Sequence, residues 1–252
     1  MKEKLKLVKN LLEKRSARRK EGKFVVEGPH LVEEAGQRIE FIVYAERLPI
    51  VEKLIGLSVP AYKVSSKEFA ALSEVDAPQG VLAVVRTFQS KLDELLKGAK
   101  TLIVYCAGIQ DPGNLGTIIR SADALGATGV ILSKGTVDLY NPKVVRSTMG
   151  SLFHLPLVTV EDDAETIKQL KKNNVKIIAT SAEAEKSCSD TELKGPVAVL
   201  IGNEGAGLAE EIIELADEVI KVPMAGKAES LNASVTTAIL LYEISRQRSG
   251  GL

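Results

Sequence analysis

The stretch TLIVYCAGIQDPGNLGTIIRSADALGATGVIL (residues 101–132) contains two apolar runs separated by a helical pattern. Leu102–Cys106 and Gly129–Leu132 are continuously apolar, which is typical of strands that helices cover on both faces. The segment 115–125 between them is predicted to be a helix. A strand, a helix and a strand in this order predict a parallel βαβ unit, and hence an α/β fold for this part of the chain.

The same alternation continues from residue 133 to the C-terminus. Further strands are expected at 155–158, 175–179, 197–201 and 218–222, and further helices at 142–147, 162–172, 208–215 and 234–246. Because strands and helices alternate, these segments predict a mostly parallel sheet with helices on both faces.

The N-terminal residues show a second α/β pattern of their own. Its expected strands are 24–27, 39–44, 61–64 and 80–85, and its expected helices are 31–35, 50–55 and 67–72. The stretch 87–100 is polar apart from the short helical piece Leu92, Leu95 and Leu96, so it is interpreted as a linker. We therefore expect one domain at 1–90, a linker at 91–100 and a second domain at 101–252.

Composition narrows the class of protein. Of the 252 residues, 45% are hydrophobic and 26% are charged, which excludes wholesale disorder. The formal net charge is zero, so a nucleic-acid partner would have to be held by a local basic patch. The start MKEKLKLVKN lacks the apolar core of a signal peptide, and no run approaches the roughly 18 apolar residues of a membrane span. A cytoplasmic protein is expected.

Cysteine and histidine are too few and too scattered to predict a metal site. Cys106 and Cys188 are isolated, and His30 and His154 lie far apart in the sequence. Neither a disulfide framework nor a transition-metal site is therefore expected. Each histidine is expected to be a structural or surface residue.

Residues 2–23 contain ten Lys or Arg against three Glu, and their apolar residues recur at helical spacing. An amphipathic basic helix is predicted here. Two interpretations stay open. The charged side chains could simply face solvent, as such runs usually do, or they could equally contact phosphates. The candidate RNA-contacting residues are Arg15, Arg18, Arg19 and Lys23.

Ligands of open parallel sheets bind beyond the carboxyl ends of the strands, so the residues after each strand are candidates for a site. After the first strand, turn formers lead into a helix that is expected to start near Asn114, with Arg120 about a turn and a half further on. A helix N-terminus with an added arginine suits phosphate or carboxylate. An ordinary capped loop with a surface arginine is the alternative.

The loop GNEGAG (202–207) follows the fifth strand. Its glycines let backbone approach a ligand, but the spacing is not GxGxxG and no Walker lysine follows, which speaks against a nicotinamide-dependent oxidoreductase and a kinase. Glu204 would repel phosphate and tolerate a cation or a ribose hydroxyl, so a sulfonium nucleoside fits this loop better than NAD or ATP does. After the sixth strand, Ser230, Asn232 and Ser234 gather at a helix start, where one of them would suffice as a cap.

Three segments together resemble the motifs of the SpoU family of ribose 2′-O-methyltransferases, within the knotted SPOUT superfamily: DPGNLGTIIRSA (111–122), LIGNEGAGL (200–208) and VPMAGKAESLNASV (222–235). FVVEG (24–28) and PQGVLA (78–83) resemble the family's L30e-like substrate-binding domain. The resemblance implies an N-terminal L30e-like α/β domain and a C-terminal SPOUT α/β domain. The latter would contain a mostly parallel sheet and a deep trefoil knot at about 196–248.

The resemblance also implies an activity: S-adenosylmethionine-dependent 2′-O-methylation of a ribose in RNA, with 23S ribosomal RNA preferred as the target. A tRNA target and a non-catalytic RNA-binding or ribosome-assembly protein are the alternatives. The implied catalytic residues are Arg120, Asn114, Glu204, Ser230 and Asn232. The implied cofactor-binding residues are Thr180, Gly202, Glu204, Gly205, Val222, Met224, Leu231 and Ser234.

Such enzymes are expected to be homodimers in which each active site draws on both chains, with the helix after residue 234 at the interface. A methyl sulfonium is already an activated electrophile, so the residues mainly have to align the weakly nucleophilic ribose hydroxyl. Arg120 is expected to orient the RNA phosphate and stabilise charge on the 2′-oxygen, because a guanidinium stays protonated and is a poor general base. Asn114, Ser230 and Asn232 would position ribose and phosphate, and Glu204 would orient Asn114, Arg120 or the cofactor.

Overall fold

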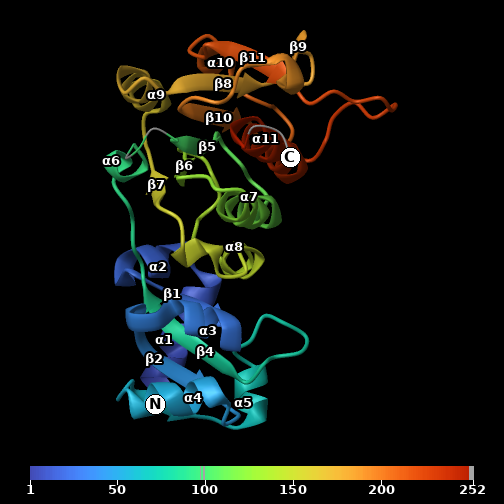
Figure 1. The fold of residues 1–252 in the computed structure, drawn as a ribbon. Coiled ribbons are helices and arrows are strands. Elements are labelled where there is room, and N and C mark those ends of the chain that lie inside the picture. The colour runs from blue at the N-terminus through green and yellow to red at the C-terminus, as the bar shows by residue number, and fades with distance from the viewer. Residues whose placement is uncertain (97, 99, 250–252) are drawn as a thin grey trace. The chain divides into compact units, whose positions relative to one another are not determined.

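The computed structural model of the chain describes residues 1–96, 98 and 100–249 (Figure 1). Residues 97 and 99 of the expected linker and residues 250–252 of the expected second domain lie outside the described residues. The chain forms two compact units. Unit 1 comprises Met1–Phe88 and Asp138–Phe153, and unit 2 comprises Gln89–Val137 and His154–Leu252.

Unit 1 is built on a four-stranded sheet in the order β1-β4-β2-β3. Strand β4 is antiparallel to β1 and β2, and β3 is parallel to β2. The elements of this unit are α1 (Lys2–Glu13), α2 (Arg15–Glu21), β1 (Lys23–Glu27), α3 (Pro29–Ala35), a 3-10 turn η1 (Gly36–Arg38), β2 (Ile39–Tyr44), α4 (Pro49–Gly56), β3 (Ala61–Lys63), α5 (Ser66–Ala70), β4 (Val81–Arg86), α8 (Pro142–Ser147) and η2 (Ser151–Phe153).

The single helix predicted over residues 2–23 is wrong at Lys14, which is extended (φ −122°, ψ 115°) and separates α1 from α2. The reason is the side chain of Arg18. Its Nη1 donates to the carbonyls of Leu11 and Leu12 at 2.7 and 3.1 Å, the groups that would otherwise accept the next amides of a continuous helix. Its Nη2 also pairs with Asp138 at 2.7 Å.

Arg18 is therefore a structural residue. Its side chain is only 6% exposed, and both its charge and its donors are engaged inside unit 1. The prediction that Arg18 contacts RNA phosphates is contradicted, because a buried and paired guanidinium is not available to a ligand. Arg15 and Arg19 are exposed on α2, whereas Lys23 is half-buried and pairs with Glu40 at 2.8 Å.

The segment Asp138–Phe153 was expected in the second domain, but it packs into unit 1. Helix α8 lies against β1, and an aromatic cluster forms around Phe24. The Phe24 ring centroid lies 4.5 Å from that of Tyr140 and 6.3 Å from that of Phe153. A helical pattern predicts that one face is buried but not against which sheet, so the sequence could not assign this segment.

Unit 2 is built on a seven-stranded sheet in the order β7-β6-β5-β10-β8-β11-β9, with every neighbouring pair parallel. Its elements are α6 (Leu92–Leu95), β5 (Leu102–Cys106), α7 (Pro112–Ala124), β6 (Gly129–Leu132), β7 (Leu157–Thr159), α9 (Asp163–Lys172), β8 (Lys176–Thr180), β9 (Lys186–Ser187), η3 (Cys188–Asp190), β10 (Val197–Ile201), α10 (Glu210–Ile213), β11 (Glu218–Lys221) and α11 (Ala233–Arg248).

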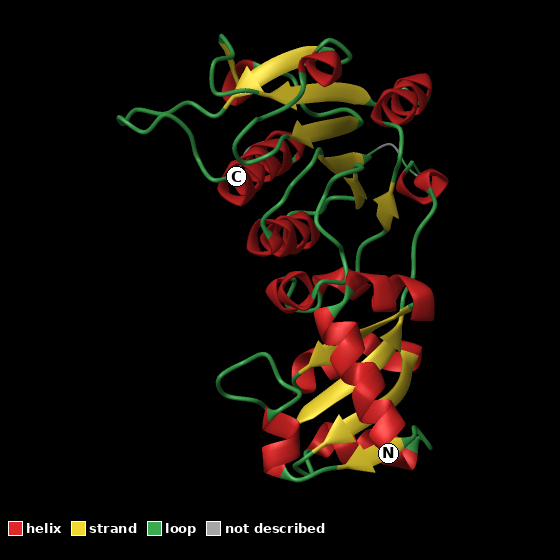
Figure 2. Ribbon diagram, turned by 180° about the vertical axis from the view of Figure 1, so that it is seen from behind, coloured by secondary structure: helices red, strands yellow, loops and turns green. Residues whose placement is uncertain are grey.

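The predicted α/β class and the mostly parallel sheet are confirmed. Figure 2 shows the yellow strands of each sheet with red helices around them. Helix α7 packs against α11, while α9 and α10 bury Ile167, Leu170 and Ile212 in a core cluster with side chains of β5, β8 and β10. These helices explain why the central strands are apolar without interruption.

Unit 2 differs from expectation in several element bounds and in the role of the expected linker. Helix α7 begins at Pro112, because Asp111 is its N-cap and accepts a hydrogen bond from the Asn114 amide at 2.8 Å. The helix expected at 208–215 is shortened to α10. The expected linker contains α6, whose Leu95 is fully buried in the core cluster of unit 2. No helix within the described ranges is long and apolar enough to span a membrane.

Candidate active site

A cavity of about 820 Å³ opens where three neighbouring strands end. Thr180 ends β8, Ile201 ends β10 and Lys221 ends β11, and all three line the cavity. Asn232, the N-cap of α11, completes the wall. The cavity thus lies beyond the carboxyl ends of parallel strands, where ligands of such sheets bind.

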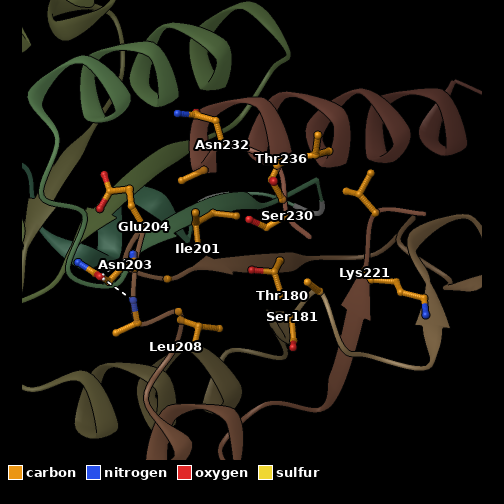
Figure 3. Close-up of a pocket in the computed structure, with 18 of the residues that line it drawn as sticks. Thr180, Ser181, Ile201, Asn203, Glu204, Leu208, Lys221, Ser230, Asn232 and Thr236 are labelled. Carbon is orange, nitrogen blue, oxygen red and sulfur yellow. Dashed lines mark hydrogen bonds between the residues drawn. The ribbon is translucent and has the colours of Figure 1, made fainter. Parts of the chain in front are cut away.

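Figure 3 shows how the side chains are distributed around this cavity. Asn203 and Glu204 lie on one side, and Lys221 lies on the other. Asn232 and Thr236 project from α11, and Ser230 and Thr180 lie between these groups. Segments that are far apart in the sequence therefore meet around one space.

The loop after β10 is a tight hairpin. The backbone amide and carbonyl of Asn203 bond to those of Gly207, both at 2.9 Å. The Asn203 Oδ1 accepts hydrogen bonds from the amides of Gly205 and Ala206 at 3.0 and 2.9 Å. These bonds fix the backbone of the cavity wall before any ligand binds.

Gly202 is required by the close approach of the two sides of this hairpin. A Cβ at position 202 would lie 2.3 Å from the carbonyl carbon of Gly207. We expect Gly202→Ala to displace the hairpin and to lower the affinity for the cofactor by at least about tenfold, because backbone rather than a flexible side chain would have to move. Calorimetric titration with S-adenosylmethionine checks this. Gly226→Ala, which meets nothing within 4 Å, is the matched control, and equal affinity of both variants would contradict the role of Gly202.

A chain of hydrogen bonds links the three sequence motifs. Glu204 Oε1 accepts from Asn114 Nδ2 at 2.9 Å, and Asn114 Oδ1 accepts from Asn232 Nδ2 at 2.9 Å. Asn232 Oδ1 in turn accepts from the amide and the hydroxyl of Ser234 at 2.8 and 2.7 Å. Each amide side chain is oriented at both ends, so this network fixes which atoms of Asn114 and Asn232 can face a ligand.

Glu204 also holds the loop before α7. Its two carboxylate oxygens accept hydrogen bonds from the amides of Gln110 and Asp111, each at 3.0 Å. Burial alone would raise the pKa of Glu204, but the hydrogen bonds from Asn114, Gln110 and Asp111 outweigh it and lower that pKa. The carboxylate is therefore ionised throughout the neutral range.

A pH dependence follows from this lowered pKa. The pKa of Glu204 is lower in the folded chain than in the unfolded chain. The ionised carboxylate therefore stabilises the fold fully at pH values above the ordinary glutamate pKa, and this stabilisation is lost as the pH falls through the folded-state pKa. We expect the affinity for S-adenosylmethionine to stay constant between about pH 6 and 8 and to fall only below about pH 5. Calorimetry across this range, with circular dichroism to monitor folding, checks the expectation. A transition near neutrality that Glu204→Gln removes would contradict it.

Most of the residues predicted for the site meet at the cavity. Those that line it are Asn114, Thr180, Gly202, Glu204, Gly205, Val222, Met224, Ser230, Leu231 and Asn232. Ser234 is buried beneath the lining and supports Asn232. Sequence reasoning did not single out Asn203 and Asp111, which also line the cavity, although an asparagine in a glycine-rich turn and an aspartate before a proline are known signals of turns and caps.

Arg120 is the exception. It is exposed on α7, it does not line the cavity, and within the described ranges its side chain forms no hydrogen bond or ion pair. Arg120 follows Asn114 by six residues on α7, a spacing that turns the two side chains to different faces of the helix.

The charges of the lining favour a cationic ligand. Asp111, Glu183 and Glu204 line the cavity against a single lysine, Lys221. A ligand with two positive groups, a sulfonium and an ammonium, suits this balance better than a polyphosphate does. No group of three or more His, Cys, Asp or Glu side chains suitable for a metal ion occurs among the residues that the structure describes.

Comparison with known proteins agrees with the motifs. Residues 101–242 match the SpoU rRNA Methylase family. The chain belongs to this family. Residues 2–83 match the MRM3-like substrate binding domain, so this SpoU member combines a methylase domain with a domain of that kind.

Relatives of this SpoU protein resemble it over nearly the whole chain. It is 36% identical over 238 residues to the 23S rRNA (guanosine(2553)-2′-O)-methyltransferase RlmP of Bacillus subtilis, covering 92% of both chains. It is 37% identical over 210 residues to the 23S rRNA (guanosine-2′-O-)-methyltransferase RlmB of Pseudomonas putida, covering 79% of this chain and 84% of the other. The structure of the SpoU methyltransferase AviRb from Streptomyces viridochromogenes in complex with AdoMet matches with a TM-score of 0.89, 33% identity and 99% coverage of both chains.

Proposed function

We propose that this chain transfers the methyl group of S-adenosylmethionine to a ribose 2′-hydroxyl of 23S ribosomal RNA. The observation that supports this best is the hydrogen-bonded network from Glu204 through Asn114 and Asn232 to Ser234, beside a glycine-rich hairpin at the strand ends. The family membership and the activities for which the relatives are named support the same reaction.

The cavity lining fits S-adenosylmethionine. Backbone groups at Gly202, Val222 and Leu231 would hold its adenine and ribose, and Thr180, Gly205 and Met224 would pack beside them. The Thr180 hydroxyl donates to the Leu200 carbonyl at 2.8 Å, which ties β8 to β10 under this part of the cavity. When bound, the cofactor would supply an activated methyl group. The S–CH₃ bond would break as the O–CH₃ bond forms, leaving neutral S-adenosylhomocysteine, and the hydroxyl proton would pass to water.

The protein's own task is to position and polarise the ribose hydroxyl. Asn114, Ser230 and Asn232 would bind ribose and phosphate. Glu204 orients Asn114, and Ser234 orients Asn232. Arg120 would bind the phosphate and stabilise the negative charge that develops on the 2′-oxygen. These positioning and charge-stabilising roles need hydrogen-bond donors rather than a strong base, and the amide, hydroxyl and guanidinium side chains named here are such donors.

We further propose that the enzyme is a homodimer. Arg120 lies outside the cavity lining of its own chain, so a second copy would bring its Arg120 to that cavity. Helix α11, which packs against α7, exposes Val235 at 46% and Tyr242 at 54%, and these side chains would be buried in the dimer. The trefoil knot at about 196–248 stays a prediction, as do the cytoplasmic location and the absence of metal ions from the reaction.

Unit 1 would bind the RNA, with Arg15, Arg19 and Lys23 as phosphate contacts. A tRNA target is the alternative. The assay that decides uses tritiated S-adenosylmethionine with unmodified transcripts of 23S rRNA and of total tRNA. Label in 23S rRNA alone supports the proposal, and label in tRNA alone supports the alternative. Label in neither RNA contradicts a methyltransferase acting on either and favours a ribosome-assembly role.

A further inference from the structure

Three cationic residues lie at one end of the sheet in unit 1. Lys23 is the first residue of β1 and lies opposite Arg86, the last residue of β4. Arg38 directly precedes β2, whose first residue Ile39 lies opposite Val85. Because β4 is the strand between β1 and β2, its end brings all three together. We call Lys23, Arg38 and Arg86 the sheet-end surface.

The two arginines of this surface are exposed but held in place. The guanidinium of Arg38 lies over the ring of Phe88, 4.7 Å from its centroid. Arg86 Nη2 donates to the Gln37 carbonyl at 3.4 Å. Phe88 is itself held in place, because its backbone amide donates a hydrogen bond to the Tyr140 hydroxyl at 2.8 Å. Both guanidinium groups are thus oriented at lower entropic cost than a free side chain would require.

The charges of the two arginines are not neutralised. Within the described ranges neither Arg38 nor Arg86 forms an ion pair with a carboxylate. Many other cations of unit 1 do. Such pairs include Lys9–Glu13, Arg18–Asp138, Lys23–Glu40, Arg47–Glu52, Lys53–Glu33 and Arg146–Glu74. Two immobilised and unpaired guanidinium groups therefore distinguish this end of the sheet from a merely solvated charged face.

We propose that the sheet-end surface binds the phosphate backbone of the RNA substrate. A guanidinium stacked on a ring leaves its edge N–H groups free, and these match two oxygens of one phosphate. Strand register fixes Lys23 opposite Arg86, so contacts to neighbouring phosphates would orient the RNA on unit 1 without selecting sequence. The inference rests on the proposed function and adds Arg38 and Arg86 to the residues that contact RNA.

The test uses the full chain with Arg38→Gln and Arg86→Gln combined, and an unmodified 23S rRNA transcript as the probe. Filter binding is measured over a series of KCl concentrations. We expect the affinity at about 0.1 M KCl to fall at least about tenfold, and the slope of log K against log[KCl] to become less steep by about 1.4–1.8. Affinity for S-adenosylmethionine should stay within about twofold, because neither arginine lines the cavity.

The matched control is Lys63→Gln combined with Lys67→Gln, which removes the same charge. Both lysines are exposed, and Lys63 lies opposite Tyr44, at the other end of β2 from Ile39. An unchanged affinity in the arginine variant, or an equal loss in both variants, would overturn the inference. If the wild-type protein binds the transcript but transfers no methyl group, the proposed function fails, whereas the difference in salt slope still decides on the sheet-end surface.

Discussion

Arg120→Ala is expected to lower kcat for methyl transfer by about 10³-fold while leaving the affinity for S-adenosylmethionine within about twofold. Arg120 is exposed, lies outside the cavity lining and has no side-chain partner among the described residues, so its removal leaves the cofactor site intact. On the role proposed for Arg120, what would be lost is a positive charge near the 2′-oxygen, where negative charge develops in the transition state. Single-turnover kinetics and calorimetry measure the two quantities separately.

Two further variants sharpen this prediction. Arg120→Lys keeps the charge but loses the planar pair of donors, so it should recover only part of the rate. Arg47→Ala removes another exposed arginine, one that pairs with Glu52 in unit 1, and should leave the rate nearly unchanged. Loss of cofactor binding in Arg120→Ala would contradict the proposed division of roles.

Glu204→Gln is expected to lower kcat/KM by about 10²-fold, with effects on both kcat and the KM for S-adenosylmethionine. The carboxylate accepts hydrogen bonds from Asn114, Gln110 and Asp111. A glutamine amide would turn its NH₂ group towards at least one of these donors. Loss of one or two charge-assisted hydrogen bonds, at about 1.5–3 kcal/mol each, accounts for a change of this size.

Glu210→Gln is the matched control for Glu204→Gln, because Glu210 is an exposed carboxylate at the start of α10 and does not line the cavity. It should retain the wild-type rate. Full activity of Glu204→Gln would show that the network does not orient Asn114. Arg120→Ala and Glu204→Gln together also test the dimer. When the two variant chains are co-expressed, activity should return if each site takes Arg120 from the other chain. Activity should stay low if each site is complete within one chain.

Much of the sheet in unit 2 could be predicted because its central strands are buried on both faces. The predicted bounds of β5, β6 and β10 are those observed, since a continuous apolar run has few alternative interpretations. The loops after β5, β10 and β11 could be predicted as a site from the position of the strand ends. Glycine, asparagine and serine cluster there, and the strand ends place them at one edge of the sheet.

Other features could not be predicted because they depend on contacts between distant residues. The break at Lys14 arises from Arg18, whose guanidinium takes the carbonyls of α1 and pairs with Asp138, 120 residues away. The placement of α8 in unit 1 depends on the aromatic cluster around Phe24. Neither interaction changes the local sequence pattern, so periodicity predicts one longer helix and leaves α8 with the second domain.

The hydrogen bonds of the site also join distant residues, and the sequence could not predict them. The sequence predicted Asn114, Glu204 and Asn232 as site residues, but not the order in which they bond to one another. Asn114 and Arg120 were expected on the same helix, but their spacing of six residues turns the two side chains to different faces, and only Asn114 lines the cavity.

The most direct test of the central claim is where the methyl group is placed. Unmodified 23S rRNA is incubated with the enzyme and tritiated S-adenosylmethionine, and the RNA is then hydrolysed in alkali. A 2′-O-methyl group blocks cleavage at its own linkage, so we expect label in alkali-resistant dinucleotides. Label in mononucleotides would mean that a base is methylated, and would contradict the assignment of Arg120, Asn114 and Asn232 to a ribose hydroxyl.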